Sequence, residues 1–144
     1  MLTPMIMELF LVRKSMVNAN ALSAYFFYMN NKDDPNAELS KEEELALKVA
    51  AQKFIDASTE LLEILESQTY ENEVDAQTPF YDVGKKYYGL EKKQLLSYFS
   101  QIYQLLFETK SGPRLGAFVF LYGKDNFLKM FRDRMNNPFY FIYF

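Results

Sequence analysis

The stretch Gln101–Arg134, QIYQLLFETKSGPRLGAFVFLYGKDNFLKMFRDR, reads as three helical segments joined by two turns that contain glycine. Pro113 suits the first position of a helix, because its φ is already helical and its missing N–H would be unpaired there. Gly112 allows a tight turn before it. Tyr122-Gly123 ends the second helix, and Lys124 or Asp125 begins the third. This stretch therefore predicts a compact helical corner.

Apolar periodicity in the rest of the chain predicts an all-α fold of about seven helices in a single compact bundle or cage, with no strand. The longest helix is expected near residues 41–68, because Ser40 and Glu43 form the spacing of a capping box. Three further helices are expected outside the corner, at Met5–Met16, Ala19–Met29 and Phe80–Tyr88, and the first helical segment of the corner is the end of a helix expected at Glu91–Glu108.

Two polar stretches predict loops, at Asn30–Leu39 and Thr69–Gln77. After the second loop, Thr78 is expected to cap a short helix in which Pro79 is the first residue. Residues 1–135 are interpreted as one helical domain. Residues 136–144, NNPFYFIYF, form an uncharged aromatic tail after it.

The composition excludes several kinds of active site. The chain has no cysteine and no histidine, which removes the commonest metal ligands and the commonest general base near neutral pH. No catalytic residue and no metal site are predicted. The apolar runs are too short to cross a bilayer, and Met1–Val12 lacks the pattern of a signal peptide. We therefore expect no membrane partner and a cytoplasmic location.

Charge divides the chain into an acidic and a basic half. Residues 1–78 contain six Lys/Arg and 14 Asp/Glu, whereas residues 79–144 contain ten and five. The basic half begins with a short helix rich in phenol rings and cations, which suit the stacking of bases and the binding of phosphates. Its candidate residues are Tyr81, Lys85, Lys86, Tyr87 and Tyr88. The alternative is that these tyrosines are half-buried and these lysines extend into solvent.

The corner also resembles the closing segment of class I lysyl-tRNA synthetases. The resemblance covers roughly Phe99–Phe131 and is carried by IYQLL at 102–106, SGPRLGAF at 111–118 and LYG at 121–123. In that family, a helix ends in a Gly-Pro-Arg turn, and a helix with a small residue and an aromatic follows. The tail after Met135 departs from the pattern.

The resemblance implies that this chain is the C-terminal helical domain that binds the anticodon stem-loop of tRNA. Its second partner would be the N-terminal catalytic domain of the same polypeptide, which uses ATP. This chain lacks that domain's histidine motif, so by itself it would be non-catalytic and would need no cofactor. The residues expected at the RNA are Arg114 for a guanidinium contact, Lys85 and Lys86 for phosphates, and Tyr81, Tyr87 or Tyr88 for stacking. The alternative function is an all-α scaffold or protein-interaction module.

Overall fold

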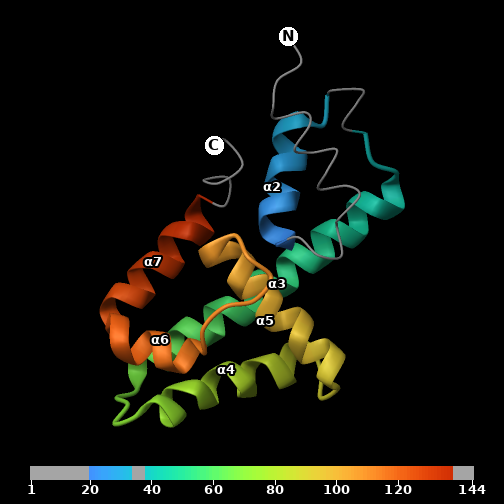
Figure 1. Ribbon diagram of the computed structural model, residues 1–144. Helices are drawn as coiled ribbons and strands as arrows, with labels where there is room; N and C mark the ends of the chain where they lie inside the picture. Colours follow the sequence, from blue (N-terminus) through green and yellow to red (C-terminus); the bar gives the residue numbers. More distant parts are fainter. Residues whose placement is uncertain (1–19, 34–37, 138–144) are drawn as a thin grey trace.

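The computed structural model describes residues 20–33 and 38–137, which form six helices and contain no strand (Figure 1). In chain order the helices are α2 (Ala21–Asn31), α3 (Lys41–Ser67), α4 (Glu73–Tyr87), α5 (Lys92–Phe107), α6 (Leu115–Tyr122) and α7 (Lys124–Asn136). The prediction of an all-α fold is confirmed. The count of seven was one too high for these residues, because the expected helix Met5–Met16 lies outside them, as does the tail from residue 138.

The long helix α3 organises the domain. It begins where the capping box predicts, since the Glu43 amide donates to the Ser40 hydroxyl oxygen at 3.0 Å and the Ser40 amide donates to the Glu43 carboxylate at 3.1 Å. Helices α2, α4 and α7 all pack against α3, and Figure 1 shows it crossing the molecule between them. Local capping chemistry therefore sets the start of the helix on which three others are assembled.

The predicted start of α4 was wrong. The helix begins at Glu73, and the Asn72 side chain caps it by accepting from the Asp75 amide at 2.9 Å. Pro79 therefore lies inside the helix, where it cannot donate the usual bond to the Asp75 carbonyl. Its ring is buried. The cap at Asn72 and the burial of Pro79 with its neighbours Ala76 and Phe80 outweigh the loss of this one backbone hydrogen bond. Because α4 begins early, the loop predicted at Thr69–Gln77 is shorter than expected.

The corner differs from its prediction in detail. α5 ends with Glu108 in the left-handed region at φ 58°. Pro113 precedes the N-cap residue Arg114 instead of opening α6, and its carbonyl accepts a hydrogen bond from the Tyr103 hydroxyl at 2.7 Å. Gly112 has no positive φ; its role is to leave room for the Tyr103 ring, which a Cβ would approach to 2.9 Å. Gly123, at φ 99°, ends α6 as predicted.

A cluster of phenylalanine rings joins four helices in the core. Phe127 of α7 makes edge-to-face contacts with Phe80 of α4 at 5.9 Å and with Phe118 of α6 at 6.0 Å between ring centroids. Phe131, one turn further along α7, contacts Phe127 at 5.8 Å and stacks against Phe54 of α3 at 6.4 Å. The corner is therefore fastened to α3 and α4 through α7.

We predict that Tyr98→Phe raises the free energy of unfolding by about 1 kcal/mol, because it removes a buried hydroxyl that lacks a hydrogen-bond partner. Tyr98 is 1% exposed, and its hydroxyl oxygen has no partner among the described residues. Burial also raises the pKa of this phenol, so the group stays neutral and gains nothing from ionisation. Urea denaturation followed by circular dichroism measures the change.

The matched control is Tyr103→Phe, which removes the hydroxyl that donates to Pro113. This variant is expected to lose about 1 kcal/mol, the usual contribution of one hydrogen bond. Equal losses in the two variants would show that the Tyr98 hydroxyl is satisfied in solution.

Candidate nucleic-acid interface

One face of α4 carries a line of exposed side chains. Val74, Thr78, Tyr81 and Lys85 are all exposed, and their spacing of four, three and four residues places them along one side of a helix. Two of them, Tyr81 and Lys85, are residues that the sequence predicted at the RNA. The helix therefore presents a ring and a cation one turn apart.

Arg114 joins this face from the start of α6. A pocket of about 140 Å³ lies between the two helices, and its lining residues are Glu73, Val74, Gln77, Thr78, Tyr81, Arg114 and Ala117. The Gly116 amide donates to the Gln77 side chain at 2.5 Å, which fixes the start of α6 against α4. The Arg114 side chain is exposed and forms no ion pair with any described residue. Its guanidinium is thus available beside Tyr81.

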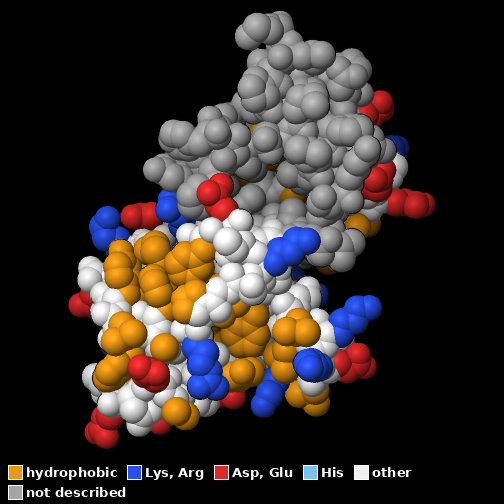
Figure 2. All heavy atoms as spheres, viewed as in Figure 1, with side chains coloured by type: hydrophobic (Ala, Val, Ile, Leu, Met, Phe, Trp, Pro, Cys, Tyr) orange, Lys and Arg blue, Asp and Glu red, His pale blue; other side chains and the backbone are white. Residues whose placement is uncertain are grey.

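Tyr81 is partly exposed and supported by a neighbouring ring, whereas Lys85 is exposed and forms no ion pair with a described residue. Tyr81 is 38% exposed, and its ring rests edge-to-face on Phe99 of α5 at 5.2 Å between centroids. This support holds the ring in place while part of it stays accessible. Lys85 is exposed, and no described carboxylate pairs with it. Figure 2 shows basic and hydrophobic side chains interleaved where α4 passes into α5.

The structure does not place Lys86 and Tyr87 with this group. The Lys86 ammonium pairs with the Glu60 carboxylate of α3 at 2.5 Å, and the Tyr87 hydroxyl donates to the same oxygen at 3.2 Å. The hydrogen bond from Lys86 lowers the pKa of Glu60, and the same bond raises the pKa of Lys86. Both side chains are therefore engaged in packing α4 on α3, because they lie on a different side of the helix from Tyr81.

Tyr88 is also occupied. Its ring is partly buried against Tyr98 at 5.3 Å between centroids, and the Lys53 ammonium lies 4.4 Å above it. Burial raises the pKa of its phenol. The Lys53 ammonium therefore occupies a ring face on which a base would stack. Of the six predicted residues, Arg114 and Tyr81 line one pocket, and Lys85 lies one turn after Tyr81 on the same side of α4.

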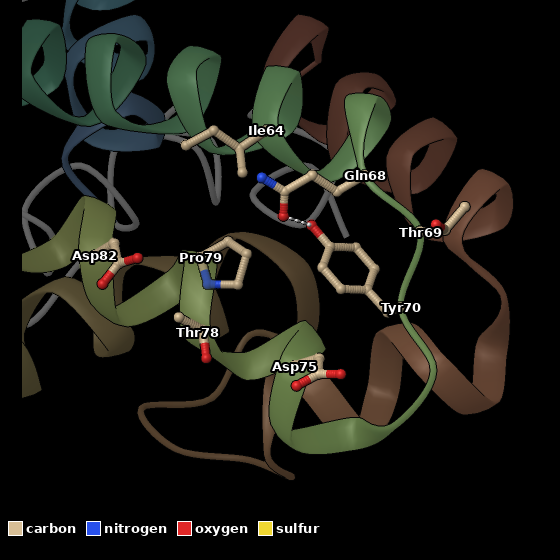
Figure 3. A pocket seen from close by; sticks show the side chains of 8 residues that line it. All are labelled: Ile64, Gln68, Thr69, Tyr70, Asp75, Thr78, Pro79 and Asp82. Atoms are coloured by element: carbon tan, nitrogen blue, oxygen red, sulfur yellow. Dashed lines mark hydrogen bonds between the residues drawn. The ribbon is translucent and has the colours of Figure 1, made fainter.

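A larger pocket lies on another side of α4, against the end of α3 (Figure 3). Its volume is about 500 Å³, and its lining residues are Ile64, Gln68, Thr69, Tyr70, Asp75, Thr78, Pro79 and Asp82. Asp75 and Asp82 supply two carboxylates, and the lining contains no basic side chain. This pocket would repel a phosphate, so it does not extend the candidate interface. The described residues contain no group of three or more metal-binding side chains.

Sequence reasoning missed Gln77 and Thr78 as parts of this face. Both were assigned to a loop and its cap because the start of α4 was placed too late. Had Asn72 been taken as the cap, helical spacing would have aligned Thr78 with Tyr81 and Lys85. No local signal indicates the Gly116–Gln77 hydrogen bond, since the partners are 39 residues apart.

Fold and site together define an all-helical domain with an exposed aromatic and basic face. No helix among the described residues is long and apolar enough to cross a membrane. No protein-family model matches the chain, and no solved structure matches it.

The chain is similar over part of its length to lysine–tRNA ligases. The ligase of Rickettsia felis is 36% identical over 77 residues, which cover 53% of this chain and 14% of that protein. The ligase of Rickettsia bellii (strain OSU 85-389) is 33% identical over 88 residues, which cover 61% of this chain and 15% of that protein. The chain thus matches about one seventh of these relatives' length. These similarities support a relation to lysyl-tRNA synthetases.

Proposed function

We propose that this chain is the tRNA anticodon-binding domain of a class I lysyl-tRNA synthetase and that it is non-catalytic by itself. The observation that carries the proposal is the meeting of Arg114 and Tyr81 at one pocket, with Lys85 one turn away, in a chain similar to lysine–tRNA ligases. ATP binding and aminoacylation would belong to a catalytic domain of the same polypeptide. The enzyme would act in the cytoplasm.

The geometry suits a single-stranded RNA loop. Such loops are recognised when unstacked bases lie on aromatic rings or guanidinium planes and when cations neutralise the neighbouring phosphates. Tyr81 would supply the ring, because Phe99 holds it from one side. Arg114 would supply the guanidinium from the adjacent helix, and Lys85 the phosphate contact. A base and its phosphate would then bridge α4 and α6.

One observation favours the alternative function as a protein-interaction module. α6 contains no charged side chain, yet Leu121 is 79% exposed and Phe120 is 45% exposed. Hydrophobic side chains gather over α6 and α7 in Figure 2. An apolar surface of this kind is typical of protein contacts. Tight binding to a separately supplied catalytic domain, with no binding of bulk tRNA, would favour this function.

We predict that Lys85→Gln weakens tRNA binding about tenfold at low salt, since a hydrogen bond to a charged group contributes about 1.5 kcal/mol or more. The slope of log K against log salt should become shallower by about one, as expected for the loss of one phosphate contact. Fluorescence titration of a labelled anticodon stem-loop between low and moderate salt measures both quantities.

Lys86→Gln is the matched control, because it removes the same charge from the next residue but breaks an ion pair with Glu60. We expect unchanged affinity and slope in this variant. Arg114→Gln should weaken binding as Lys85→Gln does. The proposal fails if binding does not weaken as salt rises, or if Lys86→Gln matters as much as Lys85→Gln.

A further inference from the structure

A pocket with basic side chains lies on a different part of the domain, between α2, α3 and α5. Its volume is about 400 Å³, within the range of small-ligand sites. Its lining residues are Ala21, Ala50, Lys53, Tyr88, Lys93, Gln94, Ser97 and Gln101. None of these is acidic, and none lines the pocket that contains Arg114. It is therefore separate from the pocket that contains Arg114, and its lining carries positive charge from its lysines.

Two lysines from different helices line this pocket without a carboxylate partner among the described residues. Lys53 comes from α3, and its ammonium is held over the Tyr88 ring at 4.4 Å. Lys93 comes from the first turn of α5; the nearest carboxylate in the sequence is that of the N-cap residue Glu91, which forms no ion pair with it. The positive end of a helix disfavours a cation at that position. An anion in the pocket would offset both charges.

The base of the pocket is well ordered by hydrogen bonds. Gln101 is only 8% exposed; its side-chain oxygen accepts from the Ala21 amide at 2.7 Å, and its carbonyl accepts from the Asn20 side chain at 2.7 Å. These bonds fix the start of α2 against α5. Because the Ala21 amide is already used, a ligand would be bound by side chains and not by the end of α2.

The donors that remain are those that phosphate groups require. Lys53 and Lys93 provide positive charge, and Ser97, exposed on α5 one turn after Lys93, provides a hydroxyl donor. Charge-assisted hydrogen bonds from ammonium groups to phosphate oxygens are among the stronger polar contacts in proteins. We propose that this pocket binds a phosphate group through Lys53, Lys93 and Ser97. The phosphate would belong either to a small phosphorylated molecule or to an RNA backbone.

The test uses the full chain labelled with ¹⁵N and three probes: inorganic phosphate, adenosine 5′-monophosphate and a short single-stranded oligoribonucleotide. We expect at least one probe to shift the backbone amide signals of Lys93 and Ser97 in a saturable way. The double variant Lys53→Gln/Lys93→Gln should weaken this binding at least tenfold. Saturation by phosphate or the mononucleotide identifies a small-molecule site, and saturation by the oligonucleotide alone identifies a backbone site.

The matched control is Lys48→Gln/Lys92→Gln, which removes two exposed lysines from the same two helices but none from the pocket. It should change the affinity less than twofold. Ser97→Glu keeps both lysines and should abolish binding, because its carboxylate would repel phosphate. Lys85→Gln should leave the shifts of Lys93 and Ser97 by inorganic phosphate unchanged, since Lys85 does not line this pocket, and this separates the site from the proposed tRNA interface. The proposal is overturned if no probe shifts Lys93 and Ser97, or if the control loses as much affinity as the pocket variant.

Discussion

Phe127→Ala is expected to lower the free energy of unfolding by about 3–5 kcal/mol, a large part of the total stability of a domain this size. Phe127 is fully buried. Its ring contacts Phe80 of α4, Phe118 of α6 and Phe131 of its own helix at 5.8–6.0 Å between centroids. Truncation would leave a cavity at the junction of three helices. Urea denaturation monitored by circular dichroism measures the loss.

Phe120→Ala is the control for this prediction, since it makes the same chemical change at a ring that is 45% exposed on α6. Its loss should be several times smaller, because much less apolar surface returns to water. If Phe127→Ala does not fold, Phe127→Leu keeps most of the volume and should cost less than half as much. Equal losses for Phe120→Ala and Phe127→Ala would contradict the assignment of Phe127 to the centre of the core.

Features set by local chemistry were predictable from the sequence. The capping box at Ser40 marks the start of α3 because the two bonds join residues three apart, and the structure contains both. Gly123 marks the α6–α7 boundary because its φ of 99° is one that side chains rarely adopt. Each feature depends on a few neighbouring residues, so distant contacts do not alter it.

Features set by competition or by distant contacts were not predictable. By local rules, Thr78-Pro79 is as good a helix start as Asn72. The helix begins after Asn72 because the side of α4 that contains Ala76 and Pro79 is buried. Gly112 was assigned a conformational role, but its requirement is space for Tyr103. In both cases the deciding contact involves residues that sequence spacing does not bring together.

In the candidate site, too, local features were predictable and features set by distant contacts were not. Composition indicated that tyrosines and lysines gather in one helix, and the structure places them there. Composition did not indicate which side of this helix faces solvent. Glu60, 26 residues before Lys86, pairs with that lysine and takes the Tyr87 hydroxyl, whereas Lys85 stays exposed. The orientation of α4 on α3 therefore separates the two neighbouring lysines.

Gly116→Ala is expected to destabilise the domain by about 1–3 kcal/mol, as overpacking usually does. A Cβ at this position would lie 2.6 Å from the Gln77 amide nitrogen and 2.6 Å from the Glu73 carbonyl oxygen. Both atoms belong to the backbone of α4, so no side chain can rotate away and α6 must shift. Alanine normally stabilises a helix relative to glycine by about 1 kcal/mol. Helix propensity alone therefore predicts that Gly116→Ala stabilises the domain, and a loss of stability would have to come from the contact with α4.

The same variant connects the packing of α6 to the proposed function. The Gly116 amide bonds to Gln77, and Arg114 lies two residues earlier in the pocket that contains Tyr81. A displaced α6 should therefore weaken binding of the anticodon stem-loop even where the variant is fully folded. Gly112→Ala is the control, because its Cβ would meet the side chains of Tyr103 and Phe107 and not the backbone of α4. A neutral or stabilising Gly116→Ala would mean that α4 and α6 are further apart in solution, and that Arg114 is not held beside Tyr81.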